Sequence, residues 1–261
     1  MTISKSLVHQ LHLLFRLAVC AEFVGHGAFG IIGKAAWLPY FAAFGISEEW
    51  AWRLMPVVGG IDITLGLLAL LSPRRLPLLW MAFWGLMTAL LRPVAGEPLW
   101  EAVERAGNVG APLALLLLSG VRGTGLGFWL WKPAHPVLTL PAALPLILRL
   151  TTSFLLIGHG MLAAAVGKAG LAAHWDALGL PGIQCLPLVG ALEITLGVTA
   201  LLTRSYSRLF LGICLWKIGN ELLFPLSGQP MWEFIERAGS YAAPLALFLI
   251  SVRSAAHGKE K

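Results

Sequence analysis

Hydrophobic residues occur in long runs along this chain, separated by short stretches that carry charged residues, proline or glycine. A helix needs roughly 20 largely apolar residues to cross about 30 Å of hydrocarbon. The runs predict about eight membrane-spanning helices, near residues 13–32, 53–72, 77–93, 100–121, 142–166, 184–203, 208–226 and 231–252. Lipid cannot satisfy free backbone N–H and C=O groups, so each span must be helical. The predicted fold class is an all-α integral membrane protein.

A second pattern is an internal repeat with an offset near 132 residues. The segment VVGGIDITLGLLALL (57–71) aligns with LVGALEITLGVTALL (188–202), and a Gly-His-Gly motif occurs once before each. The later segments LWEAVERAG (99–107) and MWEFIERAG (231–239) also align. The repeat predicts two four-helix units, 1–121 and 142–261, joined by a cytoplasmic linker at 122–141. Because each unit has an even number of spans, we expect parallel repeats that insert in the same direction.

The charged residues predict how the chain sits in the membrane. Only 12% of residues are charged while 57% are hydrophobic, so the net charge of +6 favours an orientation signal over nucleic-acid binding. Most basic residues fall on one predicted side: Lys5, Arg16, Arg74, Arg75, Arg122, Lys132, Arg149, Arg204, Arg208, Arg253, Lys259 and Lys261. The opposite loops hold only Lys34, Arg53, Arg92 and Lys168. We therefore expect both termini in the cytoplasm and a multi-pass protein of the inner (plasma) membrane, surrounded by the lipid bilayer.

The acidic residues show the opposite bias. Only Glu260 is predicted on the cytoplasmic side, whereas the following lie at mid-membrane or in the outer half: Glu22, Asp62, Glu97, Glu101, Glu104, Glu193, Glu221, Glu233 and Glu236. Ionisable groups inside a membrane are costly and usually face a partner or a water-filled cavity. This asymmetry predicts a polar site in the outer half of the bundle.

Five residues are candidates for binding a cofactor. His26 and His159 lie near the outer ends of the first helix of each unit, and Asp62 and Glu193 lie midway along the second helices. Glu22 comes one turn before His26 and could orient its imidazole. Structural pairing of the two mid-span acids, and simple hydrogen bonding of the histidines, remain open alternatives.

A wider polar cluster surrounds these candidates. Glu101, Glu104 and Arg105 recur as Glu233, Glu236 and Arg237, with spacings that place each set on one helical face. Lys217 and Glu221 occur in the second unit alone, where the first has Gly85 and Ala89. Helix-dipole capping by the first-turn acids and structural ion pairs between helices are the alternatives to a functional role.

The Arg16, Gly33-Lys34 pattern in the first span and the acidic residue before a Gly-Leu-rich second span resemble the DoxX-like membrane proteins. The resemblance implies four-helix units, here a tandem pair covering nearly all of the chain except the tails and the linker. Members of this family have been tied to quinone-linked oxidoreduction, to membrane assemblies that handle oxidative stress, and to assembly-factor roles. The resemblance therefore indicates the fold more directly than the function.

Several motifs are absent from the sequence. Cys20, Cys185 and Cys214 have no C-x-x-C spacing, and we find no Walker loop, dinucleotide fingerprint or H-E-x-x-H motif, so no metal site is predicted. The first hypothesis is a redox component that binds quinone or haem b and works with a membrane redox partner or subunit. The alternatives are a non-enzymatic scaffold or assembly partner, and a small-solute or ion/proton transporter. Whether the protein is an enzyme stays open.

Overall fold

A computed structural model describes residues 5–203 and 207–258, with the side chains beyond residue 255 left out. The chain is 79% helix and contains no strand within these ranges. Seven helices are long and apolar enough to cross a membrane. They are α1 (Lys5–Ile32), α3 (Glu48–Leu71), α4 (Arg75–Val94), α7 (Leu144–Met161) with its π-helical extension η3 (Leu162–Val166), α9 (Gly182–Leu202), α10 (Ser207–Leu226) and α12 (Ala238–Gly258).

The span predicted near 100–121 is instead built from two pieces, α5 (Trp100–Val103) and the 13-residue α6 (Ala106–Leu118). The break has a local cause. Nη1 of Arg105 donates to the carbonyl oxygen of Glu101 at 2.6 Å, the acceptor that the Arg105 amide would use in a continuous helix. The same contact, from Arg237 to Glu233 at 2.6 Å, separates α11 (Trp232–Ile235) from α12.

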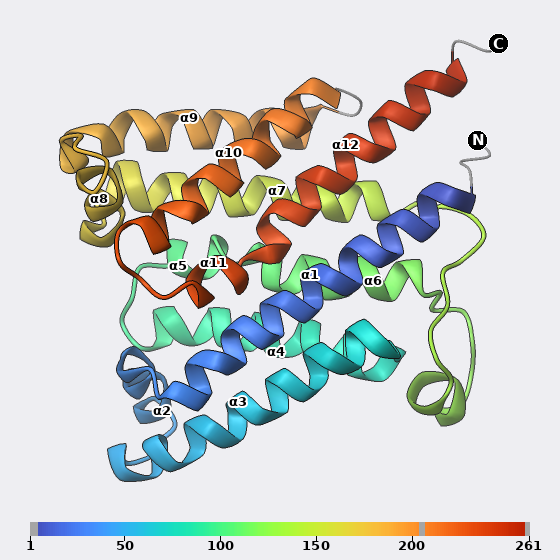
Figure 1. Cartoon of the computed structure of the whole chain (residues 1–261), viewed down its shortest axis with the longest axis horizontal. Coiled ribbons are helices and arrows are strands. Elements are labelled where there is room, and N and C mark those ends of the chain that lie inside the picture. Colours follow the sequence, from blue (N-terminus) through green and yellow to red (C-terminus); the bar gives the residue numbers. More distant parts are fainter. Residues whose placement is uncertain (1–4, 204–206, 259–261) are drawn as a thin grey trace.

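Four helices form the centre of the bundle. Helices α6 and α12 each contact α1 and α7 and also contact each other. On the outside, α3 packs on α1, α4 on α6, α9 on α7 and α10 on α12 (Figure 1). Leu11, Phe15, Leu115 and Leu148 are fully buried between the central helices. The N-terminal half (residues 1–121) therefore meets the C-terminal half (142–261) along α1–α12, α6–α7 and α6–α12.

The two ends of the bundle carry different elements. The short helices η1 (Ala35–Trp37), α2 (Leu38–Ala42) and α8 (Ala169–Asp176) lie at one end, and both termini lie at the other, beside η2 (Gly127–Trp131) of the predicted linker (Figure 1). At the terminal end, Arg75 donates to the carbonyl oxygens of Ser119 at 2.8 Å and Gly120 at 2.7 Å. The predicted positions of Arg204, Lys259, Glu260 and Lys261 lie outside the described residues.

The glycine before each histidine lets the two halves approach closely. A Cβ atom at Gly25 would lie 2.6 Å from the backbone nitrogen of Glu236, and one at Gly158 would lie 2.3 Å from that of Glu104. Because real Cβ atoms essentially never come this close, only glycine fits both positions. Each histidine-bearing helix therefore lies directly against the Glu-Arg motif of the other half.

Candidate functional site

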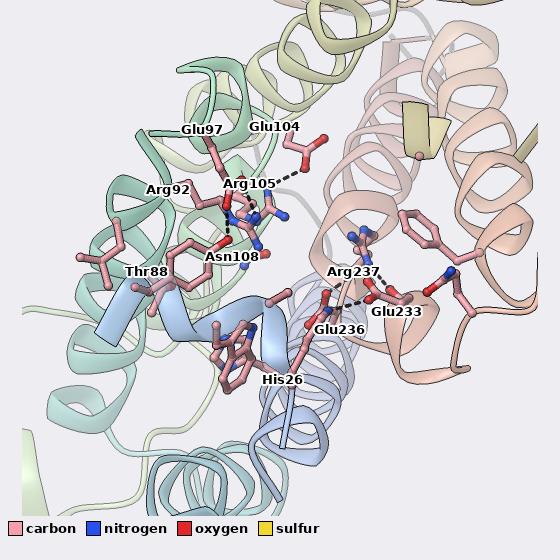
Figure 2. Close-up of a pocket in the computed structure, with 18 of the residues that line it drawn as sticks. His26, Thr88, Arg92, Glu97, Glu104, Arg105, Asn108, Glu233, Glu236 and Arg237 are labelled. Atoms are coloured by element: carbon pink, nitrogen blue, oxygen red, sulfur yellow. Dashed lines mark hydrogen bonds and ion pairs between the residues drawn. The ribbon is translucent and has the colours of Figure 1, made fainter. Parts of the chain in front are cut away.

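A cavity of about 890 Å³ opens between the halves at the end that carries α2 and α8. Residues of both halves line it, so neither half forms it alone. Its apolar wall includes Trp37, Phe41, Trp84, Leu155 and Phe224. Its polar wall includes histidines, basic residues, glutamates and uncharged polar side chains such as Asn108. Figure 2 shows two charged groups on opposite sides of the view, with His26 below them.

Both predicted histidines line this cavity, and each is held by a buried carboxylate. Nδ1 of His26 lies 2.8 Å from Oδ2 of Asp62, and Nδ1 of His159 contacts Oε2 of Glu193. These contacts join α1 to α3 and α7 to α9. An ionised carboxylate can only accept, so Nδ1 carries a proton, and in the neutral imidazole Nε2 then keeps its lone pair. Neither Nε2 forms a hydrogen bond to any residue that the structure describes.

The prediction that Glu22 orients His26 is wrong. Oε1 of Glu22 accepts from the backbone N–H of Gly239 at 3.0 Å, and Oε2 has no partner within the described ranges. Asp62 takes the role assigned to Glu22 because it approaches Nδ1 from the neighbouring helix. Glu22 instead links α1 to α12 across the boundary between the halves.

The two histidine–carboxylate pairs differ in their surroundings. Glu193 also accepts from Trp216 Nε1 at 2.9 Å and from Asn220 Nδ2 at 3.4 Å. Trp84 aligns with Trp216 in the repeat, but its buried Nε1 has no partner among the residues described. The carboxylate of the first half is Asp62, which has one methylene fewer than Glu193. The first half therefore keeps an unused indole donor beside the cavity.

A first ion-pair network, held mainly by the N-terminal half, contains three cations and three carboxylates. Its members are Arg92, Arg105, Lys168, Glu97, Glu101 and Glu104. Lys168 reaches Glu101 at 2.5 Å and thereby joins the halves. Arg105 bridges Glu101 at 3.1 Å and Glu104 at 2.6 Å. The charges within this network balance.

The second network repeats this composition in the C-terminal half. Its members are Lys34, Lys217, Arg237, Glu221, Glu233 and Glu236. Lys34 crosses to Glu233 at 2.6 Å, and Lys217 pairs with Glu221 at 2.7 Å. Glu101 and Glu233 also occupy the first turns of α5 and α11, so the capping and pairing interpretations are compatible.

Aromatic side chains of the short helices η1 and α2 also belong to the cavity. The ring of Trp37 stacks on His26 with a centroid distance of 4.6 Å. Tyr40 donates its hydroxyl to Glu97. Although burial opposes it, the Tyr40 hydrogen bond and Arg92 lower the pKa of Glu97, which stays ionised. In the sequence, the cluster of aromatic residues at 37–44 and the Gly-Lys motif before it are the features that could have predicted this part of the cavity wall.

His174 of α8 was missed by sequence analysis. It lies edge-on to Phe224 with ring centroids 4.3 Å apart, and burial, then the neighbouring His159, lowers the pKa of His174 to about 4. The ring is therefore neutral at neutral pH.

This burial predicts an acid sensitivity. The unfolded chain binds a proton at His174 first as the pH falls, so stability that is present above pH 6.5 is lost between about 6.5 and 4. Between pH 6.5 and 5, the free energy of unfolding should fall by about 2 kcal/mol less in His174→Gln than in the wild-type protein. Unfolding by SDS at several pH values measures this. An equal slope in the wild-type protein and in His174→Gln would contradict the assignment.

No family model, curated protein or solved structure matches this chain. The resemblance to DoxX-like proteins therefore stays a prediction. The seven apolar helices and the charged internal cavity define the class: a multi-pass α-helical membrane protein whose polar residues gather at one end of the bundle.

Proposed function

We propose that this protein is a membrane redox component whose cavity binds a quinone head group. The observation that carries the proposal is that two carboxylate-held histidines from different halves line one cavity with an aromatic wall. Quinone reduction adds two electrons and two protons to a planar apolar ring with two oxygen atoms. An aromatic wall suits the ring, and imidazoles whose proton is fixed by a carboxylate suit proton exchange with the oxygens.

The proposed topology follows from the sequence repeat and the ends of the bundle. We infer two parallel four-helix units, with α5 and α6 together making the eighth crossing. Both termini would be cytoplasmic in an inner (plasma) membrane, and the cavity would face the outer side. Electrons would come from, or pass to, a separate membrane redox partner.

Haem b is a second candidate because of the free Nε2 atoms. Histidines that ligate metals usually donate their other ring nitrogen to a carboxylate or carbonyl, as His26 and His159 do here. These two residues would hold the haem, which would supply one-electron transfer. The described part of the chain has no group of three or more metal-ligating side chains, whereas a bis-histidine haem needs only two.

The test is solvent extraction of quinone from the detergent-purified protein, with an oxidised-minus-reduced absorption spectrum of the same sample. We expect bound quinone in about equimolar amount and its loss in His26→Ala and His159→Ala. The control is Glu49→Gln, an exposed position on α3 outside the cavity. Soret and α bands that vanish in the histidine variants would assign haem instead. A protein that neither contains quinone nor binds added quinone would exclude the proposal and favour the scaffold alternative.

A further inference from the structure

The hydrogen-bonding capacity of the two histidines restricts which redox form of a quinone the cavity accepts. Each Nδ1 proton points to a carboxylate, so in the neutral ring each Nε2 offers a lone pair and no hydrogen. The side chains of His26 and His159 keep 27% and 11% of their surface exposed, and both line the cavity. A ligand that reaches them meets two acceptors.

The two redox forms of a quinone differ in their ability to donate. The oxidised form carries two carbonyl oxygens, which only accept hydrogen bonds, whereas the hydroquinone carries two hydroxyl groups that donate and accept. A carbonyl placed against Nε2 would leave two acceptors facing each other and both desolvated. A hydroxyl in the same place donates to Nε2, and the buried carboxylate behind the ring strengthens that bond.

The charged lining does not offset this preference. Each of the six basic side chains of the two networks contacts a glutamate and keeps further N–H groups, which suit either form because hydroxyl and carbonyl oxygens both accept. The amide of Asn108, which also lines the cavity, can serve either form because it both donates and accepts. The unused Nε1 donor of Trp84 also suits either form, since hydroxyl and carbonyl oxygens both accept.

We propose that the cavity binds hydroquinone in preference to quinone, with His26 and His159 accepting from its hydroxyl groups through Nε2. This inference rests on the quinone-binding function proposed above. It assigns Asp62 and Glu193 as positioning residues that fix the tautomer of each imidazole. It also predicts that binding to this protein raises the midpoint potential of the quinone couple, because the reduced form is held more tightly.

Anaerobic titration calorimetry with a decyl-substituted benzoquinone and with its hydroquinone tests the inference on the full chain in detergent. One additional hydrogen bond to each imidazole should make the hydroquinone bind at least about tenfold more tightly. Asp62→Asn and Glu193→Gln keep the side-chain shape, but the amide can donate to Nδ1 as well as accept from it. The imidazole can then adopt either tautomer. The double variant should bind both forms with affinities within about threefold, and Glu49→Gln should keep the wild-type ratio.

Each outcome separates the two proposals. Failure of both forms to bind would overturn the quinone function and this inference together. Equal affinity in the wild-type protein, or tighter binding of the oxidised form, would overturn the preference and leave the quinone function standing. An unchanged ratio in folded Asp62→Asn or Glu193→Gln single variants would overturn the role given to the carboxylates.

Discussion

Replacing Glu221 with leucine should lower the free energy of unfolding by about 3–5 kcal/mol, because it leaves a buried ammonium without its carboxylate. The side chain of Lys217 is 1% exposed, and Glu221 is the one carboxylate within salt-bridge distance of its Nζ in the described part of the chain. Leaving one buried charge unpaired costs more free energy than removing both charges of the pair. Titration with SDS, followed by the change in helical circular dichroism, measures the difference.

Removing both charges should recover most of this stability. In the Lys217→Met, Glu221→Leu double variant, no charge is left unpaired, because Arg237 keeps Glu233 and Glu236. The aligned positions of the first half, Gly85 and Ala89, show that the repeated helix does not need the pair. Apolar replacement of a buried ion pair is often neutral or stabilising.

An exposed ion pair provides the matched control. Arg53 and Glu49 are four residues apart on α3, as Lys217 and Glu221 are on α10, but their side chains are 61% and 73% exposed. Arg53→Gln should therefore cost less than about 1 kcal/mol. If Glu221→Leu lowers the free energy of unfolding by as little as Arg53→Gln does, Lys217 keeps its hydration in the cavity and the pair is not removed from water.

The spans were largely predictable from sequence because the lipid environment leaves few alternatives. Helices α3, α9 and α10 begin and end within a few residues of the predicted runs, since a long apolar segment in hydrocarbon must be helical. The break between α5 and α6 was not predictable in this way. It depends on the Arg105 guanidinium binding the Glu101 carbonyl, and hydropathy does not register a side chain that replaces a backbone donor.

The composition of the site was partly predictable, whereas its pairings were not. Position in the repeat identified His26 and His159, but helical spacing suggested Glu22 as the partner of His26, and Asp62 holds that place. Contacts such as Lys34 with Glu233 join residues 199 positions apart, so only the packing of the halves reveals them. The unpartnered Trp84 donor is likewise visible only in the packed structure, although Trp84 aligns with Trp216 in the repeat.

The close approach of the halves leads to the second large effect, at Gly158. An alanine Cβ there would lie 2.3 Å from the backbone nitrogen of Glu104, and a backbone atom cannot swing away as a flexible side chain can. Gly158→Ala should force α7 away from α5 and cost about 3 kcal/mol or more. The same shift would separate Lys168 from Glu101. The loss of unfolding free energy, measured with SDS, should therefore be larger than overpacking alone would cause.

Gly219 of α10 supplies the control for this substitution. A Cβ at Gly219 meets nothing within 4 Å, so Gly219→Ala should be neutral or stabilise the helix by up to about 1 kcal/mol through reduced backbone entropy. Both variants add one methyl group to a membrane-crossing helix, and they differ in what the methyl group meets. Similar stabilities for Gly158→Ala and Gly219→Ala would mean that the halves can separate slightly without loss. In that case the cavity would be shaped by the ion-pair networks alone, and Lys34→Met with Lys168→Met would then be the substitutions that open it.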